Sequence, residues 1–531
     1  MEQYASPDTR ARRLSRWLMR GEAEALPVAR WERVLVLAAM TIALGLGTAH
    51  LSAPSLWHDE LVHVFVAKNI TETLEPRLPS GVFYANAHAY NYLLAGFIAV
   101  LGDNEFAVRL PSAIFSALNV LLLYVLVRKL LGRETALMAA FMLAMFPWSV
   151  AWSRQARFYT LQQTFYLLML WLAWRAFTTD RRKQAVRNGA GACLAFVGGM
   201  LTSVHSVLFL GPVAAYAAVR ALCERQLRSK WVLACVLAAV LAVAALSLYY
   251  LQAETVDRRV VFERSGVGGR TVAPHEDPVR SARLYYLHWL NNNLSTGFLL
   301  AGLAGSVLML VNKGHRGLFA LFAFWGPFVA LTYLIGYRRA RFLFFAYPFL
   351  IAAQAYFIVE SVRFMKTWRR SWSRAAIALL LLAFGIRLAW STLLLTGDSL
   401  EAARGHDITL ARHHPPWRGP CAYVRERLDS DTVVVTTTGL PVLYYVGRVD
   451  EHFPSRIMWW EVEEIGLQGL EDAAALEAFM ARHPKGYFIE HIRRLSMWEA
   501  LFAEEIAFVN DRMQLIEEAS SHWVRVYAWG M

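Results

Sequence analysis

The sequence predicts a polytopic α-helical membrane protein with a soluble α/β domain at its C-terminal end. Of its 531 residues, 56% are hydrophobic, and the mean hydropathy is +0.34. Several windows reach the roughly 17 to 25 apolar residues that a membrane-spanning helix requires. After Thr396 the composition changes to that of a soluble domain. These observations exclude an ordinary soluble protein.

The charge and the cysteine content argue against a nucleic-acid-binding protein and against a disulfide-rich or cysteine–metal protein. A net charge of +13 would suggest a nucleic-acid partner in a soluble chain, but here much of the excess lies in short loops between apolar runs, where cytoplasmic loops are basic. We therefore expect no nucleic-acid partner. The positions of the four cysteines indicate neither a disulfide framework nor a cysteine-based metal site. The basic N-terminal segment lacks a small-residue cleavage site, so the first span should be retained.

The spans follow from hydropathy and charge. Residues 1–33 are polar and rich in arginine, so they should be cytoplasmic, and Val34–Leu51 should cross outward. The apolar run Tyr90–Leu101 is too short to cross and is expected along the interface, since a crossing there would place the later basic turns outside. Residues 189–220 are either two short spans or one long helix, and basic residues at both ends favour two. With the first, eleven spans are expected, the others at about 110–127, 135–152, 158–174, 189–204, 206–220, 231–251, 294–311, 317–336, 342–359 and 375–395.

This topology divides the chain into the cytoplasmic segment 1–33, a transmembrane domain and an external domain. Residues 34–396 form the transmembrane domain, with long external loops at 52–109 and 252–293, and we interpret the second loop as a lid over an external cavity. Residues 397–531 form the external α/β domain. Its expected elements are a helix at 419–429, a β-rich run at 432–437, an apolar run at 440–446, a helix near 472–482 and strands at 486–490 and 524–529.

The external segment after the first span carries two adjacent acids, Asp59 and Glu60. Carboxylates at a membrane surface are functional candidates, because hydrocarbon penalises their charge. The alternative is structural, with Asp59 starting a short helix that Glu60 continues. We predict that Asp59 and Glu60 form the catalytic pair.

Other external positions carry arginines, which suit phosphate because they form bidentate charge-assisted hydrogen bonds. Alternatively, Arg109 and Arg341 lie at helix ends and extend their charged groups toward water. Arg154 and Arg157 could instead be an ordinary pair of arginines at the membrane interface. His88 is interpreted as a structural or second-shell residue, or else as a metal ligand. The predicted phosphate-binding residues are Arg157, Tyr159, Arg154, Arg109, Arg341 and Arg338.

These side chains suit one kind of external chemistry. Soluble nucleotide sugars are not supplied outside the cytoplasm, so an activated sugar must arrive on a lipid such as a polyprenyl phosphate. Its phosphate is already a good leaving group and requires positive charge, from arginines or a metal ion. The acceptor hydroxyl must then be deprotonated or oriented, which a carboxylate such as Asp59 can do.

Four motifs occur in order along the chain. They are Leu56-Trp57-His58-Asp59-Glu60, His88 before a helix ending in Gly102-Asp103-Asn104-Glu105, Arg109-Leu110-Pro111-Ser112-Ala113, and Ser153-Arg154-Gln155-Ala156-Arg157-Phe158-Tyr159. Together they resemble the GT-C membrane glycosyltransferases, most closely the bacterial branch related to protein O-mannosyltransferases and lipid A aminoarabinose transferases. The resemblance covers roughly residues 30–180, and more loosely the Arg341-Phe342 start of a later span.

The resemblance implies an inverting transferase that uses a polyprenyl-phosphate sugar, with Asp59 as the base and Arg157 and Tyr159 at the donor phosphate. Relatives commonly have His-Pro-Pro where this chain reads His88-Ala89-Tyr90, and often a second acid in the second loop. These departures put a divalent metal ion, and any transfer of the acceptor type, in doubt.

The resemblance also implies a multi-pass protein of the bacterial inner membrane, with a cytoplasmic N-terminus and a periplasmic C-terminal domain. The acceptor is lipid A, another envelope glycan, a glycolipid or a protein. Alternatives are a glycan ligase that uses a pyrophosphate lipid, and a lipid or sugar transporter, although no internal repeat is present and the polar residues gather at one surface. A membrane anchor for a partner-binding domain would not need so many spans.

Overall fold

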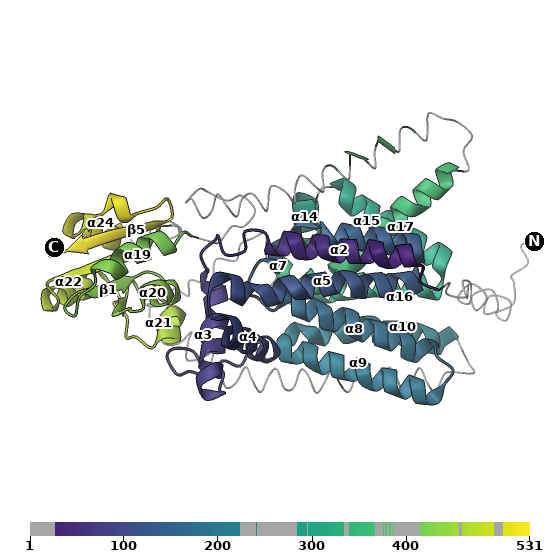
Figure 1. Cartoon of the computed structure of the whole chain (residues 1–531), viewed down its shortest axis with the longest axis horizontal. Coiled ribbons are helices and arrows are strands. Elements are labelled where there is room, and N and C mark those ends of the chain that lie inside the picture. Colours follow the sequence, from purple (N-terminus) through teal and green to yellow (C-terminus); the bar gives the residue numbers. More distant parts are fainter. Residues whose placement is uncertain are drawn as a thin grey trace, which may run out of the picture.

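The computed structural model consists of a helical bundle and a smaller C-terminal α/β domain, with a helical hairpin between them (Figure 1). The two domains lie at opposite ends of the molecule's long axis. The structure describes residues 27–223, 284–294, 296–333, 339–366, 415–455, 459–492 and 503–531, with single positions at 241, 375, 378–379, 382–383 and 386.

The bundle contains helices that are long and apolar enough to cross a membrane. Six such segments occur in the described part, or seven when a bent pair is counted as one span. The protein is therefore a multi-pass membrane protein. The six comprise α2 (Arg30–Thr48), α5 (Glu105–Leu130), η1 with α10 (Val204–Phe209 and Leu210–Cys223), α15 (Thr296–Lys313), α16 (His315–Tyr333), and η3 with α17 (Ala340–Ala346 and Tyr347–Lys366).

Two more long helices, α8 (Tyr159–Thr178) and α9 (Arg182–Thr202), run along the bundle beside α10 (Figure 1). The predicted ambiguity at 189–220 is resolved, because the helix ends at Ser203, whose backbone is extended, and a new helical segment begins at Val204. Two helices therefore occupy this stretch. The predicted spans at 231–251 and 375–395 lie outside the described residues, except for single positions.

The span expected at 135–152 is bent. It consists of α6 (Arg133–Ala144) and α7 (Pro147–Ser153), which meet at an angle of 55°. Proline disfavours a helical conformation at the preceding residue, and Phe146 is indeed extended while Pro147 occupies the first turn of α7. The bend directs the end of α7 toward the loop that carries Arg154 and Arg157.

The short apolar run forms α4 (His88–Leu101), which pairs with α3 (His58–Thr73). The two helices lie at the end of the bundle, and α3 runs across the direction of α2 and α5 (Figure 1). The position of α4 along the interface stays a prediction. Basic residues end α5 and start α9 at the opposite end of the bundle, where Arg128, Lys129 and Arg182 are found.

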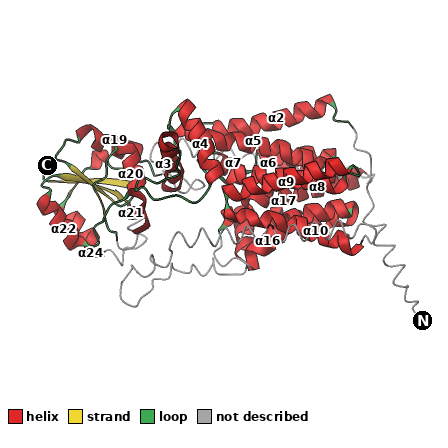
Figure 2. Ribbon diagram, turned by 90° about the horizontal axis from the view of Figure 1, so that it is seen from below, coloured by secondary structure: helices red, strands yellow, loops and turns green. Residues whose placement is uncertain are grey.

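The C-terminal domain contains a five-stranded sheet with the order β2-β1-β3-β5-β4 among the described residues. Strand β1 pairs in parallel with β2 on one side and with β3 on the other, whereas β5 runs antiparallel to β3 and β4. Helices lie on both sides of the sheet (Figure 2). The strands are β1 (Val433–Thr436), β2 (Glu451–His452), β3 (Gly486–His491), β4 (Gln514–Leu515) and β5 (Val524–Trp529).

The helices of this domain confirm most of the predicted elements. The apolar run at 440–446 is a helix, because Gly439 and Pro441 occupy its first turn after the strand ends. The helices are α19 (Arg418–Arg427), α20 (Gly439–Val446), α21 (Trp459–Ile465), α22 (Ala473–Arg482), α24 (Ala503–Arg512) and the short η4 (Glu517–Ala519). One further helix, α14 (Tyr285–Leu294), belongs to the bundle.

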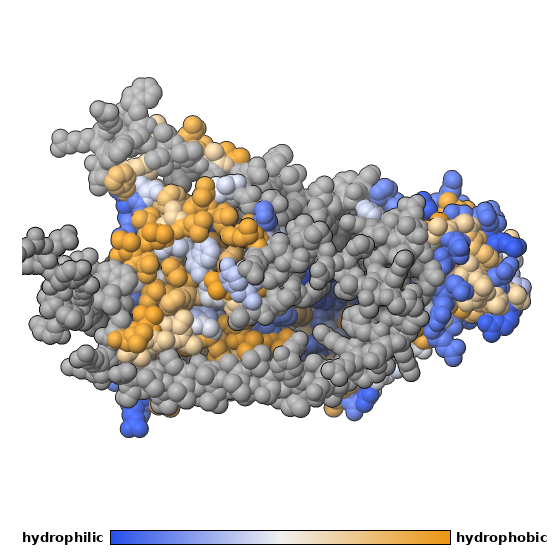
Figure 3. Space-filling model, turned by 180° about the vertical axis from the view of Figure 1, so that it is seen from behind, coloured by the Kyte–Doolittle hydropathy of each residue, from blue (hydrophilic) through white to orange (hydrophobic). Residues whose placement is uncertain are grey.

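The surface separates the two domains by polarity. Hydrophobic residues cover much of the visible bundle face, whereas hydrophilic residues are frequent on the C-terminal domain (Figure 3). An apolar belt on the bundle is what a lipid environment requires. The hairpin α3–α4 packs on the C-terminal domain through a shared core that includes Leu61, Leu440 and Ile465. The hairpin α3–α4 therefore lies between the bundle and the C-terminal domain.

Candidate active site

The candidate site is built on the first turn of α3. Trp57 is the N-cap, and Glu60 at the third position accepts a hydrogen bond from the Trp57 backbone N–H at 3.3 Å. Acidic residues are favoured there because a helix N-terminus carries partial positive charge. Successive side chains on a helix point about 100° apart. Asp59 and Glu60 consequently face different surroundings.

Glu60 faces the interior and is fully buried together with Arg109 of α5. The Arg109 guanidinium binds both carboxylate oxygens, each at 2.8 Å, and Glu60 also accepts the backbone N–H of Ala156 at 2.7 Å. Arg109 further donates to the carbonyls of residues 51, 54 and 55. The predicted phosphate contact of Arg109 and the predicted catalytic role of Glu60 do not suit these positions, because both side chains are fully buried and these contacts lead into the protein. The pair instead joins α3 to α5 and to the loop at 154–158.

Asp59 faces two arginines that come from distant parts of the chain. Its Oδ2 atom lies 3.1 Å from Nη1 of Arg341 and 3.4 Å from Nη2 of Arg157. The Asp59 side chain is 27% exposed and the Arg341 side chain is 29% exposed, whereas Arg157 is nearly buried. The structure therefore brings together one carboxylate and two guanidinium groups, at a place that remains open to an incoming molecule.

The two arginines determine the protonation state of Asp59. Burial raises the pKa of this carboxyl group, but the positive charges of Arg157 and Arg341 lower it more, so that the pKa falls to about 2. Asp59 is therefore ionised at neutral pH.

Arg157 is held in place by its own loop and by α3. Its Nη1 donates to the backbone carbonyl of Asp59 at 2.6 Å, and its Nη2 contacts the Tyr159 hydroxyl at 3.4 Å. The guanidinium also lies over the rings of Trp57 and Tyr159, with its carbon 6.0 and 5.5 Å from their centres. Such cation–π contacts favour a fixed guanidinium. Arg157 and Tyr159, both predicted to lie at the donor phosphate, are therefore in contact with each other.

Arg341 is held by the turn η3, which precedes α17. The Phe344 carbonyl of this turn accepts a hydrogen bond from Gln163 of α8 at 3.0 Å, and the Ala340 N–H donates to the Tyr285 hydroxyl at 3.2 Å. The ring of His205, at the break between α9 and α10, stacks on Phe342 with ring centres 4.1 Å apart. The turn that presents Arg341 to Asp59 is thus fixed by three other elements.

Comparisons with known proteins agree with this architecture. A family model of dolichyl-phosphate-mannose-protein mannosyltransferases matches residues 86–250. The Bacillus subtilis protein YkcB, which is named for a mannosyltransferase activity, is 29% identical over 147 residues. This match covers 25% of the present chain and 20% of YkcB, so it spans only a fifth of the length of that relative.

Solved structures match over nearly the whole chain. ArnT from Cupriavidus metallidurans in the apo state has a TM-score of 0.58 at 11% identity, covering 93% of this chain and 98% of ArnT. ArnT bound to undecaprenyl phosphate has a TM-score of 0.57 at 13% identity, covering 94% and 98%. AglB from Archaeoglobus fulgidus, in complex with an inhibitory peptide and a dolichol-phosphate, has a TM-score of 0.55 at 14% identity, covering 90% and 71%. These matches show that the chain has the GT-C fold.

Three more residues predicted for the candidate site lie away from Asp59 or outside the described residues. Arg154 donates to the carbonyl of Leu46 at 2.8 Å and so contacts the end of α2. The ring of His88 lies against Phe83, and none of the contacts recorded for it in the described part involves Asp59 or the two arginines. Arg338 is outside the described residues.

The side chains around the GT-C site do not suit a divalent metal ion. Within the residues that the structure describes, no group of three His, Cys, Asp or Glu side chains is arranged to hold one. Asp59 is paired with two cations, which would repel a metal ion.

Two histidines near Asp59 were not singled out from the sequence. His63, one turn further along α3, is buried, and its Nδ1 lies 2.7 Å from Oδ1 of Asn91. Burial and the charge of Arg157 lower the pKa of His63 to about 3, so its ring is neutral. Nε2 of His58 lies 3.0 Å from Oε2 of Glu464 in the C-terminal domain. Because His58 is next to Asp59 in the sequence, it could have been predicted to lie near the site. Nothing in the sequence around Glu464 indicated its contact with His58.

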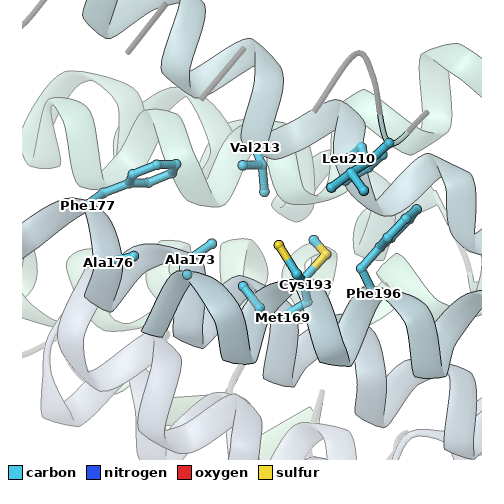
Figure 4. A pocket seen from close by; sticks show the side chains of 11 residues that line it. Met169, Ala173, Ala176, Phe177, Cys193, Phe196, Leu210 and Val213 are labelled. Atoms are coloured by element: carbon cyan, nitrogen blue, oxygen red, sulfur yellow. The ribbon is translucent and has the colours of Figure 1, made fainter. Parts of the chain in front are cut away.

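A separate cavity of about 110 Å³ lies between α8, α9 and α10 (Figure 4). Its lining is apolar and includes Met169, Ala173, Phe196 and Leu210. At about 1.5 Å per helical residue, Ala173 lies roughly 20 Å along α8 from Tyr159 at the GT-C site. Among the described residues that line it there is no carboxylate, imidazole or guanidinium group, so this cavity is not the candidate site.

Proposed function

We propose that the protein is a glycosyltransferase that moves a sugar from a polyprenyl-phosphate donor to an acceptor hydroxyl, with inversion at the anomeric carbon. The acceptor belongs to lipid A, another envelope glycan, a glycolipid or a protein. The reaction takes place at the periplasmic face of a bacterial inner membrane, with the N-terminus in the cytoplasm. The GT-C fold and the mannosyltransferase family match support this proposal.

The observation that carries the proposal is the position of Asp59 against Arg157 and Arg341. Guanidinium groups bind phosphate through charge-assisted hydrogen bonds. Two of them beside a partly exposed carboxylate provide both groups that the reaction needs, a cationic site for the leaving phosphate and a base for the acceptor. The undecaprenyl phosphate and dolichol-phosphate in the ArnT and AglB structures support a lipid phosphate as the ligand class.

The proposed reaction uses these residues in a defined order. The donor phosphate binds Arg157 and Arg341, which then share their positive charge between the phosphate and Asp59. Because this weakens their hold on Asp59, its basicity rises from the low value that the ion pairs impose. The acceptor oxygen then attacks the anomeric carbon, its proton moves to Asp59, and the bond from that carbon to the phosphate oxygen breaks. The arginines stabilise the negative charge that develops on the phosphate.

The other predicted residues have supporting roles in this proposal. Tyr159 positions Arg157, while Glu60 and Arg109 fix the first turn of α3 and the loop at 154–158. Arg154 ties that loop to α2. These roles keep the carboxylate and the guanidinium groups in a geometry that suits the reaction.

The test is mass spectrometry of lipids and envelope glycans from cells that carry wild-type protein, Asp59→Asn or no copy. The wild type is expected to yield a species heavier by one sugar, and Asp59→Asn to lack it, because the amide keeps the shape of the side chain and loses its basicity. Asp103→Asn is a matched control, because Asp103 is an exposed acid that pairs with Lys68 of α3 and contacts neither Arg157 nor Arg341 in the recorded ion pairs of the described residues. Wild-type product levels in Asp59→Asn would refute the base assignment.

A further inference from the structure

The C-terminal domain contacts the polypeptide immediately beside Asp59. Oε2 of Glu464, on α21, lies 3.0 Å from Nε2 of His58, the distance of an ion pair when the imidazole is protonated. The two side chains are only 19% and 12% exposed. A second acid, Glu461, lies 3.9 Å from the other ring nitrogen of His58. His58 is therefore enclosed by carboxylates that come from another domain, about four hundred positions along the chain.

Backbone contacts reinforce this junction on both sides. The carbonyl of Glu464 accepts the N–H of Ser80 at 3.2 Å, and the hydroxyl of Tyr445 accepts the N–H of Leu56 at 2.7 Å. The Tyr445 hydroxyl in turn donates to Glu105 at 2.9 Å. Residues that precede Asp59 are thus held by α20 and α21, whereas the carbonyl of Asp59 itself is held by Arg157.

This arrangement matters because His58 and Asp59 are adjacent in the first turn of a helix. A helix N-terminus is the part most prone to fraying, since its first N–H groups have no partners within the helix. Without the contact to Glu464, the turn would have more freedom. Asp59 would then spend less time in the position where one oxygen meets both arginines.

We infer that Glu464 is a positioning residue for the proposed transfer, acting through His58, and that the C-terminal domain thereby completes the active site. The inference rests on the proposed function. It gives the C-terminal domain a role that a simple cover over the membrane domain would not have, because one of its side chains sets the orientation of a carboxylate in the neighbouring domain. Glu464 does not touch the reacting groups in this scheme.

The experiment compares the full-length wild type with Glu464→Ala, Glu464→Gln, His58→Ala and the double variant His58→Ala/Glu464→Ala. Loss of positioning should lower kcat of Glu464→Ala about 10- to 100-fold while KM for the lipid donor stays within about twofold. Glu464→Gln keeps an oxygen near His58 and should stay within about fivefold of the wild type. The double variant should be no slower than either single variant, because both remove one contact.

A second measurement needs no substrate and is independent of the proposed function. Hydrogen exchange of the backbone amides at residues 57–61 should be faster in Glu464→Ala than in the wild type. Lys485→Gln is the matched control, because it breaks an ion pair within the C-terminal domain, the 2.5 Å pair with Asp429, and leaves the contacts of Leu56 and His58 in place. It should change neither this exchange nor kcat.

The outcomes separate the two hypotheses. A wild-type protein that transfers no sugar would refute the proposed function, while the exchange experiment would still test the contact between domains. Unchanged kcat and unchanged exchange in Glu464→Ala would overturn the inference. It would also be overturned by a Gln variant as slow as the Ala variant, or by a double variant whose loss equals the product of the two single losses.

Discussion

The buried pair of Glu60 and Arg109 leads to the sharpest stability prediction. In Glu60→Gln one carboxylate oxygen becomes an NH2 group. Each oxygen accepts two N–H groups, since Oε1 binds Arg109 and Ala156 while Oε2 binds Arg109 and Trp57. Whichever way the amide is turned, its NH2 faces two donors. The charge of Arg109 is also left buried without its counter-ion.

The expected cost is about 3 to 5 kcal/mol in the free energy of unfolding, the range for a buried ion pair that loses one partner. Arg109→Met should cost more than Glu60→Gln. It removes the counter-ion of a buried carboxylate and also the donors for the carbonyls of residues 51, 54 and 55. Both variants should lose transfer activity indirectly, because α3 and the loop at 154–158 are no longer joined.

Thermal unfolding of purified full-length protein in detergent, followed by tryptophan fluorescence, measures this cost. The matched control is Asp59→Asn, which changes the adjacent acid in the same way but at a partly exposed position. It should lower stability by no more than about 1 kcal/mol, as expected for a partly exposed pair. If Glu60→Gln keeps the wild-type unfolding midpoint, or if Asp59→Asn is equally destabilised, the assignment of structural and catalytic roles to the two acids is refuted.

Three further predictions follow. Arg341→Ala should weaken binding of undecaprenyl phosphate roughly 10-fold, since a hydrogen bond to a charged group contributes about 1.5 kcal/mol or more; equal affinity in a binding titration would exclude Arg341 from the phosphate site. The ion pairs of Asp59 stabilise the protein fully above the ordinary carboxyl pKa of 3.8, and that contribution disappears as the pH falls toward about 2. The stability difference between wild type and Asp59→Asn should therefore be constant from about pH 7 to 4 and shrink below it, and a decline already between about pH 6 and 5 in thermal unfolding would contradict the lowered pKa. Gly305→Ala should destabilise the protein by about 1 to 3 kcal/mol, because its Cβ would lie 1.9 Å from a backbone oxygen of α17, whereas Gly297→Ala in the same helix has open space and should unfold at the wild-type temperature.

The sequence alone determined the features that depend on local composition. Long apolar runs predicted most of the described helices of the bundle, because the length of a span is set by the thickness of the membrane. The short run at 90–101 was predicted, from its length and from the charges of later loops, to lie along the interface; it forms the short helix α4, and its interfacial position stays a prediction. The sequence also predicted that Asp59, Arg157 and Arg341 would share one surface.

Only the tertiary structure decided which of the two adjacent acids faces Arg157 and Arg341. Asp59 and Glu60 are equivalent in a one-dimensional pattern, but a helix turns them apart, and packing against α5 buries Glu60 with Arg109 while Asp59 meets Arg341, 282 positions away. The contact of His58 with Glu464 has the same origin. Pairings between distant segments depend on how whole elements pack, and local periodicity carries no record of the partner.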